Sequence, residues 1–177
     1  MKARYAHRVK RKATFDSSFW VHTVYLDLVE FLLHDYELFC TPAVEHEIGQ
    51  ANPTGLKLKG LIADGVIQRD TATVEKVKLY GNGERVAMNL ALEKRLLLLI
   101  DDWKPYEAAL GYGVEVVNSL IYLVRLYDQG QISVERALEA LAKMTRRGTV
   151  KPEWILGALK MVALMRNKKQ LEEERDE

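Results

Sequence analysis

The sequence predicts an α/β protein, a three-layer α/β/α fold with a central parallel sheet and extra C-terminal helices. The first observation is the run Leu96–Ile100, which is short, apolar and uncharged, as expected of a strand buried on both faces of a parallel sheet. The second is that similar runs alternate with helical patterns, which favours right-handed crossovers between parallel strands. The third is that the chain after Ser133 has only helical patterns, and these helices can pack on one side of the sheet.

The expected strands are short runs rich in apolar or β-branched residues. The first of them ends at Asp16, and the buried run ends at Asp101 and Asp102. In chain order the expected strands are Ala13–Phe15, Glu37–Cys40, a segment near Val66–Ile67, Leu96–Ile100 and Val114–Val117.

The expected helices begin at residues that suit a first turn. Ser17 or Ser18 can cap the first helix, and Pro42 fits the first position of the second. Asn52–Gly55 is interpreted as a break followed by a weaker segment, whereas Gly81–Gly83 is a turn that opens a helix. In chain order the expected helices are Phe19–Leu32, Pro42–Ile48, Glu84–Arg95, Tyr106–Leu110, Leu120–Tyr127, Val134–Thr145 and Pro152–Lys168.

Composition excludes several classes of protein. A hydrophobic content of 48% in 177 residues supports a real core, and 26 basic against 25 acidic residues give a net charge of +1, which predicts no class of partner. Cys40 is the only cysteine, so an intramolecular disulfide is excluded and a reducing compartment is expected. No apolar run approaches the roughly 18 residues of a membrane span, and no signal peptide is recognisable. We expect a soluble, cytoplasmic protein with no membrane partner.

Charge is unevenly distributed along the chain and suggests four parts. Residues 1–12 form a basic arm that contains no acid and can either contact nucleic acid or be a solvated terminus. Residues 13–132 are expected to form the α/β domain, and residues 133–170 the helices packed on it. Residues 171–177 form an acidic tail. The basic residues of the arm are Lys2, Arg4, Arg8, Lys10, Arg11 and Lys12.

Acidic residues follow two of the expected strands. Asp16 ends the first strand, and Asp101 and Asp102 follow the buried one. In parallel sheets the carboxyl ends of the strands share one edge, and ligands bind in the crevice outside it. Carboxylates that lose solvent there repel one another unless a cation or a hydrogen-bond donor neutralises them.

Two further acids can be placed by helical angle. Glu84 shares the apolar face of its helix with Ala87 and Ala91, which directs it towards the same crevice, although it can also simply favour the helix N-terminus. On the short helix after Pro42, Glu47 falls on the apolar side and Glu45 on the far side. We therefore expect Glu47 rather than Glu45 to point inward.

So many carboxylates in one crevice predict a bound cation. Ligands that are all oxygen select hard ions, Mg²⁺ or Mn²⁺, over zinc. Such an ion lowers the pKa of a bound water and offsets charge on a phosphate undergoing in-line displacement. The chemistry that this pattern favours is phosphodiester hydrolysis.

Four motifs that contain these acids follow one another along the chain. They are Phe15-Asp16-Ser17-Ser18, Val44-Glu45-His46-Glu47-Ile48, Gly83-Glu84-Arg85-Val86-Ala87 and Leu99-Ile100-Asp101-Asp102. In this order they resemble the PIN domain, and in particular the small prokaryotic branch related to VapC-type toxin ribonucleases. The resemblance spans roughly residues 13–130. It implies a central parallel sheet between helices, acids that bind Mg²⁺ or Mn²⁺, and endonucleolytic cleavage of RNA.

The resemblance also implies roles for single residues. Asp16, Glu47 and Glu84 correspond to the first three acids, and either Asp101 or Asp102 to the fourth. The branch often has Gly-Thr-Leu where this chain has Asn118-Ser119-Leu120, so Ser119 can keep a hydroxyl near the metal-bound water. Trp103-Lys104-Pro105 departs from the commoner basic turn. A homodimer and an antitoxin partner are implied as well, and a catalytically inactive PIN-fold RNA-binding or protein-interaction module is the alternative.

The remaining candidates concern RNA contacts. Lys104, Arg146 and Arg147 are the candidates for phosphate contacts, although solvated helix ends are the default explanation of such basic clusters. The aromatic residues Trp20, Trp103 and Tyr106 can stack on unpaired bases or belong to the core. The histidines have no metal-ligand spacing and are read as surface or crevice-rim residues, with His46 the one that can line the site. They are His7, His22, His34 and His46.

Overall fold

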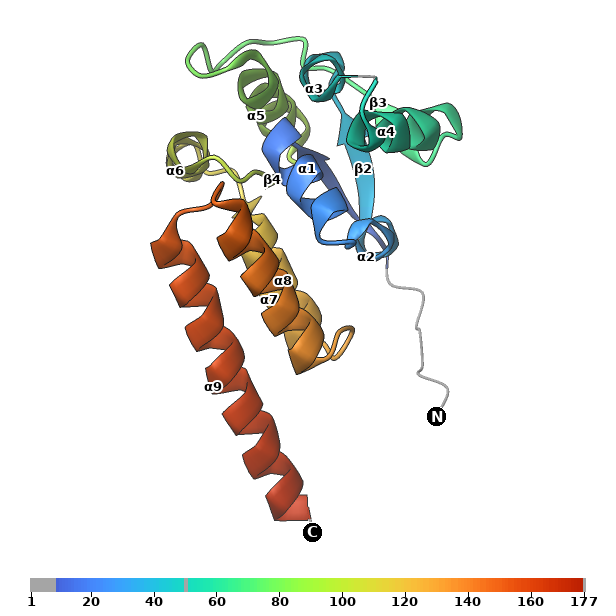
Figure 1. Ribbon diagram of the computed structural model, residues 1–177. Coiled ribbons are helices and arrows are strands. Elements are labelled where there is room, and N and C mark those ends of the chain that lie inside the picture. The colour runs from blue at the N-terminus through green and yellow to red at the C-terminus, as the bar shows by residue number, and fades with distance from the viewer. Residues whose placement is uncertain (1–8, 50, 177) are drawn as a thin grey trace. The chain divides into compact units, whose positions relative to one another are not determined.

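The computed structural model describes residues 9–49 and 51–176 (Figure 1). The chain forms two compact units, one ending at Val117 and the other beginning at Asn118. Of the predicted basic arm, Lys2, Arg4 and Arg8 lie outside the described residues.

The first unit is built on a five-stranded sheet in which every neighbouring pair is parallel, so the predicted fold class is confirmed. The strand order is β3-β2-β1-β4-β5, which places β1 at the centre with β2 on one side and β4 on the other. Successive strands run outward from β1 to β3, and the chain then returns to the other side of β1. The strands are β1 Arg11–Phe15, β2 Tyr36–Cys40, β3 Ile67–Arg69, β4 Leu97–Leu99 and β5 Val116–Val117.

The sheet is buried on both faces, as the apolar runs predicted. Leu97, Leu98 and Leu99 of β4 are each no more than 1% exposed. Ala13 in β1 is in register with Leu38 on one side and Leu97 on the other. Burial of successive residues requires cover on both faces, because their side chains alternate between them.

The helices of the first unit differ from the predicted ones in two places. The expected helix that ran to Leu32 is two helices, since Asp27 has a φ of 56° and ends the first. Asn52 does not break the chain but caps a helix: its Oδ1 accepts from the Gly55 N–H at 2.8 Å, and Pro53 occupies the first turn. The helices are α1 Ser17–Tyr25, α2 Val29–Asp35, α3 Pro42–Ile48, α4 Pro53–Ala63, α5 Asn82–Lys94 and α6 Trp103–Gly111.

Helix α1 is fixed to the sheet by its aromatic side chains. Trp20 is fully buried and stacks on Phe15 of β1 with ring centroids 5.4 Å apart. Its Nε1–H donates to the Thr54 carbonyl of α4 at 3.2 Å. Trp20 is therefore a core residue and is not available to stack on a base.

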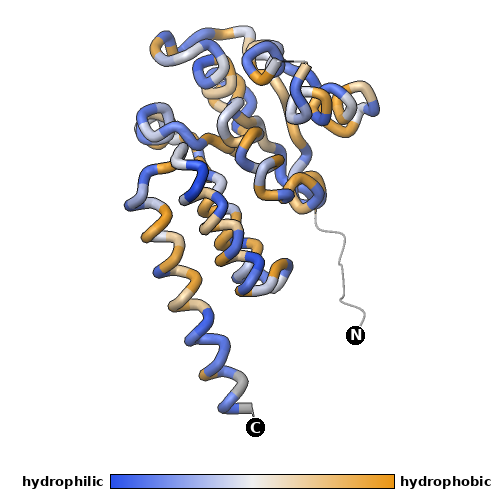
Figure 2. The backbone as a smooth tube through the Cα atoms, in the orientation of Figure 1, coloured by the Kyte–Doolittle hydropathy of each residue, from blue (hydrophilic) through white to orange (hydrophobic). Residues whose placement is uncertain are grey.

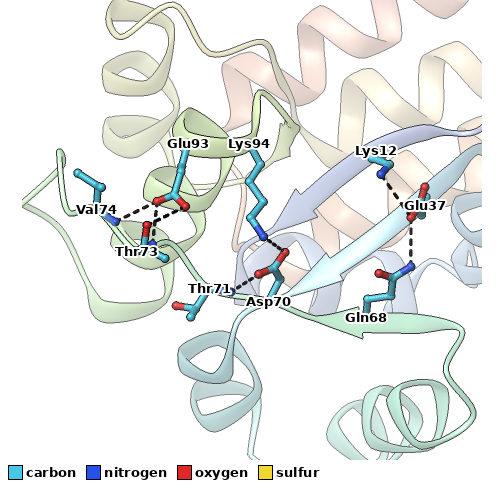
Figure 3. A network of polar contacts seen from close by, with 9 residues as sticks. All are labelled: Lys12, Glu37, Gln68, Asp70, Thr71, Thr73, Val74, Glu93 and Lys94. Carbon is cyan, nitrogen blue, oxygen red and sulfur yellow. Dashed lines mark hydrogen bonds and ion pairs between the residues drawn. The ribbon is translucent and has the colours of Figure 1, made fainter.

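The segment between β3 and α5 is tied to α5 by polar contacts (Figure 3). The Glu93 carboxylate accepts from the backbone N–H groups of Thr73 and Val74 at 2.7 and 2.9 Å, and Lys94 pairs with Asp70. The same figure shows Glu37 of β2 between Lys12 and Gln68 on the neighbouring strands. The contacts of Glu93 and Lys94 tie α5 to the segment that follows β3, whereas those of Glu37 join neighbouring strands.

The second unit consists of three helices that pack on one another: α7 Ser119–Asp128, α8 Val134–Arg147 and α9 Pro152–Asp176. Lys169 of α9 donates to the Tyr127 carbonyl at 2.8 Å and lies over the Tyr127 ring. The predicted acidic tail continues α9 as far as Asp176, and Figure 2 shows the helix becoming hydrophilic towards that end. Within residues 9–49 and 51–176, no helix combines the length and apolar character needed to traverse a bilayer.

Candidate functional site

Two of the predicted acids follow the adjacent strands β1 and β4. The Asp16 backbone N–H donates to the Leu99 carbonyl at the end of β4, 3.0 Å away. Asp101 follows Ile100, whose N–H donates to the Val117 carbonyl of β5 at 3.0 Å. The parallel pairing brings both acids to the carboxyl edge of the sheet, at the point where the strand order reverses. This is where open α/β sheets bind their ligands.

Asp16 is completely buried, and only half of its carboxylate is used by the fold. Oδ1 accepts from the Phe19 N–H at 2.8 Å and so caps α1, a role that the sequence assigned to Ser17 or Ser18. Oδ2 is buried and has no hydrogen-bond partner among the described residues. A buried carboxylate oxygen without a donor is costly, so it needs a proton or a cation.

The negative charges around Asp16 increase its need for a proton or a cation. Burial raises the pKa of Asp16 well above its ordinary value, and the negative charge of Asp101 raises it further. The Phe19 N–H opposes this, whereas the charges of Glu84 and Asp102 add to it. Several acids from distant parts of the chain therefore lie close enough to Asp16 to disfavour its ionisation.

Glu84 lies in the first turn of α5 and repeats the pattern of Asp16. Its Oε2 is buried without a hydrogen-bond partner among the residues described. Burial raises the pKa of Glu84, its own backbone N–H lowers it, and the charges of Glu47 and Asp102 raise it. Glu84 thus belongs to the same group of carboxylates. We call Asp16, Glu47, Glu84, Asp101 and Asp102 the acidic cluster.

Glu47 connects three helices at the edge of the acidic cluster. Its Oε2 accepts from the Ser17 hydroxyl of α1 at 2.9 Å, and its Oε1 accepts from the Gly83 N–H of α5 at 2.6 Å. A Cβ at Gly83 would overlap this carboxylate, so glycine leaves the room that Glu47 occupies.

Glu45 lies two residues away and has a different partner. Both of its oxygens bind the Arg69 guanidinium, at 2.7 and 2.8 Å, and this ion pair lowers the pKa of Glu45. Glu45 is the more buried of the two glutamates, yet Glu47 is the one that joins the acids. Glu47 is exposed, so the prediction that Glu47 rather than Glu45 points inward is wrong with respect to burial, because the Arg69 guanidinium provides Glu45 with a partner.

The two aspartates after β4 have different surroundings. The Asp101 side chain is only 3% exposed, and its Oδ2 lies 2.6 Å from Nδ1 of His22 in α1. Asp102 is exposed and precedes α6 without making a side-chain cap bond to it. The prediction that the histidines lie at the surface or rim is wrong for His22, which is 4% exposed. His46 is exposed. A histidine on the face that α1 buries, three residues after Phe19, was the available signal.

The other predicted residues are divided between the two units. Ser119 belongs to the second unit, where it is buried in the first turn of α7 after the cap Asn118. Arg146 and Arg147 are exposed in the last turn of α8, also in the second unit. Lys104 is exposed in α6 of the first unit. Their roles towards a metal-bound water or RNA stay predictions.

Comparison with known proteins decides the family. The DUF3368 family model, described as a PIN domain, matches residues 14–162. The chain belongs to the PIN domain family. This confirms the family predicted from the four motifs, while the VapC-type branch stays a prediction.

PIN domains are in general nucleases and typically use divalent metals. Among solved structures, a PilT N-terminus domain protein from the hyperthermophilic archaeon Sulfolobus solfataricus P2 is 18% identical to this PIN domain protein. That match covers 60% of this chain and 86% of the other, with a TM-score of 0.38. No curated protein matches the chain significantly.

The chemical type of the residues in the acidic cluster suits a divalent metal. All are carboxylates, which are the ligands of hard ions such as Mg²⁺ and Mn²⁺. The unpartnered oxygens of Asp16 and Glu84 are the atoms that an ion would satisfy. Among the described residues, no three acidic, histidine or cysteine side chains converge as a preformed metal cage. Metal binding would therefore require these carboxylates to come closer together, and it would offset the burial and the neighbouring charges that raise the pKa values of Asp16 and Glu84.

Proposed function

We propose that this PIN domain protein is a Mg²⁺- or Mn²⁺-dependent endoribonuclease. The observation that carries the proposal is the pair of buried carboxylate oxygens, one on Asp16 and one on Glu84, that have no donor among the described residues and are surrounded by other acids. Structural carboxylates are normally hydrogen-bonded or paired, as Glu45 is with Arg69. A cluster that leaves its inner oxygens unpaired fits a cation site better than a scaffold role.

Each acid has a task that its surroundings favour. A bound divalent ion would supply an activated water and offset charge that builds up on the scissile phosphate. Asp16 and Glu84 would hold the ion with their buried oxygens. Glu47, oriented by Ser17 and Gly83, would complete the ligand set from α3.

The aspartates after β4 and one hydroxyl complete the proposed site. Asp101 would contribute negative charge from within, and the exposed Asp102 would offer a carboxylate to the ion from the solvent side. We also propose that the Ser119 hydroxyl orients the metal-bound water, as the resemblance to the VapC-type branch implies. Nuclease sites that rely on a metal need no side-chain nucleophile, because the attacking group is water.

Helix α6 carries groups suited to single-stranded RNA. Trp103 and Tyr106 stack on each other with nearly parallel rings, their centroids 6.1 Å apart. Flat aromatic faces beside a metal site favour unpaired bases, and Lys104 adds a positive charge for the phosphates. Arg146 and Arg147 of α8 are proposed as further phosphate contacts.

The test is cleavage of an end-labelled single-stranded RNA by the full chain. We expect internal cleavage with Mg²⁺ or Mn²⁺, loss of cleavage on chelation, and its return when metal is restored. The inactive-module alternative instead predicts RNA binding that survives chelation without any cleavage. An Asp16→Asn variant purified in the same way distinguishes true activity from a contaminating nuclease.

Glycine at position 83 provides a separate prediction. Gly83→Ala places a methyl group where the Glu47 carboxylate now lies, and that carboxylate can swing away because it is at the end of a flexible side chain. We expect about a tenfold loss of Mn²⁺ affinity and cleavage, which is the lower end of what disturbing a group that orients a ligand costs. Thermal unfolding should change little. A Gly60→Ala variant, where nothing lies within 4 Å of the new methyl group, is the control. Equal Mn²⁺ affinity in the two variants would contradict the role of Glu47.

The proposal includes a homodimer formed through the second unit. Helices α8 and α9 line a groove of about 200 Å³ whose apolar residues include Val134, Leu138 and Leu159. The end of α8 is basic and the end of α9 acidic, so two α9 helices packed antiparallel would bring each acidic end to the basic end of the other copy's α8. This charge complementarity favours a second copy as the occupant.

Light scattering after size exclusion tests the dimer. We expect twice the chain mass for the parent and the single chain mass for Leu159→Glu, because a buried unpaired charge would oppose the interface. Leu56→Glu on α4 is the control, since Leu56 is also an exposed leucine but lies in the first unit. A monomeric parent would contradict the homodimer.

The finer proposal is that the protein is a toxin. A small protein encoded beside it that binds it and blocks cleavage would support this proposal, and one that binds without effect would weaken it.

A further inference from the structure

His22 and Asp101 form a buried pair that the proposed roles leave unexplained. Nδ1 of His22 lies 2.6 Å from Oδ2 of Asp101, and the two side chains are only 6% and 3% exposed. The residues are 79 positions apart in the sequence, one in α1 and the other after β4. This is not a surface ion pair formed by chance between flexible side chains.

Helix α1 holds the imidazole in place. The helix begins at its cap Asp16, stacks Trp20 on Phe15, and carries a second internal bond from the Thr23 hydroxyl to the Phe19 carbonyl at 2.8 Å. These contacts fix the turn that bears His22. Helix α1 therefore begins at Asp16, and His22 in its last turn contacts Asp101.

The direction of the hydrogen bond follows from the chemistry of the partners. When the carboxylate is ionised it can only accept, and the hydrogen bond then requires a proton on Nδ1 of the imidazole. That proton fixes which imidazole nitrogen faces the acid. It also leaves Asp101 with one oxygen engaged by His22.

Resting on the proposed function, we propose that His22 is a positioning residue that donates its Nδ1–H to Asp101 and holds this carboxylate against the acidic cluster. This hydrogen bond gives the two adjacent aspartates, Asp101 and Asp102, different roles. The Asp101 side chain is buried and restrained by His22, whereas Asp102 is exposed and makes no side-chain cap bond to α6. The rise in the pKa of Asp16, caused first by burial and next by the charge of Asp101, supports the closeness of that carboxylate to Asp16.

Two substitutions separate positioning from packing. His22→Leu fills a similar volume but removes the donor, whereas His22→Asn keeps an N–H close to the position of Nδ1. We expect His22→Leu to weaken Mn²⁺ binding, measured by calorimetry without RNA, by about 10- to 100-fold, as loss of an orienting partner usually does. His22→Asn should recover most of that loss. Cleavage should fall through kcat more than KM, because RNA contacts are unchanged.

The control is Thr23→Val, which removes a buried hydrogen bond from the same turn of α1 without altering the bond to Asp101. A structural role alone would lower the unfolding temperature of all three variants and leave Mn²⁺ affinity unchanged, and that result would overturn the inference. Failure of His22→Asn to recover affinity in a folded protein would overturn it too.

A measurement on the parent protein keeps the inference testable if His22→Leu does not fold. Nitrogen-15 NMR should show the His22 proton on Nδ1 and slow exchange of that proton with water. A proton found on Nε2 alone would overturn the inference. A parent that binds no Mn²⁺ yet shows the Nδ1 proton would refute the proposed function while leaving the His22–Asp101 bond established.

Discussion

Asp16→Asn should abolish metal-dependent RNA cleavage while the protein remains folded. Asparagine keeps an oxygen that can accept from the Phe19 N–H, so α1 retains its cap. What it loses is the negative charge at Oδ2, the buried atom without a partner. A loss of at least about 100-fold is expected, since charge stabilisation by a bound metal contributes several kcal/mol and each 1.36 kcal/mol is tenfold in rate. The measurement is single-turnover cleavage of labelled RNA at saturating Mn²⁺.

The same substitution should stabilise the metal-free protein. Burial and neighbouring acids raise the pKa of Asp16 above the value of about 3.9 that applies in the unfolded chain. Between those two pKa values the folded state holds a proton that the unfolded state has released. The free energy of unfolding therefore falls as pH rises from about 4 to the folded pKa, and stays lower above it. Asparagine removes this loss, so at pH 7 without metal the variant should unfold at a higher temperature than the parent.

Two comparisons make this result decisive. Near pH 3, where Asp16 is protonated in both states, the parent and Asp16→Asn should have similar unfolding temperatures. Asp16→Ala loses both the charge and the cap, which is worth about 0.5–2 kcal/mol, and should be less stable than Asp16→Asn. A variant that cleaves as the parent does, or that is destabilised at pH 7 with its cap intact, would remove Asp16 from the proposed site.

The sequence was sufficient to place the acids that follow strands. An uncharged apolar run has few environments other than the middle of a parallel sheet, so the burial of Leu97–Leu99 and the common edge for Asp16 and Asp101 could be inferred together. Glu84 could also be placed, because the regular spacing of an α-helix puts it on the same face as the small residues one and two turns later. These inferences use local patterns with a single dominant period.

The wrong predictions concern residues whose local sequence fits two different structures, or residues whose partner is far away in the sequence. Asn52 followed by Pro53 suits a turn as well as a helix start, and only packing selects the helix. His22 lies on the buried face of α1, yet the acid it faces is 79 residues away, and no local pattern encodes that pairing. The same limit applies to Glu45, whose burial depends on Arg69 of β3.

Mn²⁺ is expected to raise the unfolding temperature of the parent in the absence of RNA. A ligand that binds only the folded state at 100 times its Kd adds about 2.7 kcal/mol, and each kcal/mol is worth roughly 2–4 °C in a chain of this size. The increase should be lost in Glu84→Gln, which keeps the shape of the side chain but removes the charge on its buried oxygen. Calorimetric titration of each variant gives the affinity directly.

Glu45→Gln is the matched control for this loss. It removes a charge from the same group of helices, but that charge is neutralised by Arg69 and has no task in the acidic cluster. Its unfolding temperature should fall because the ion pair is broken, and its response to Mn²⁺ should remain. If Glu45→Gln lost the response as fully as Glu84→Gln, then Mn²⁺ would be acting through overall negative charge. A specific site requires the two glutamates to differ, because only Glu84 has a buried oxygen that nothing else among the described residues satisfies.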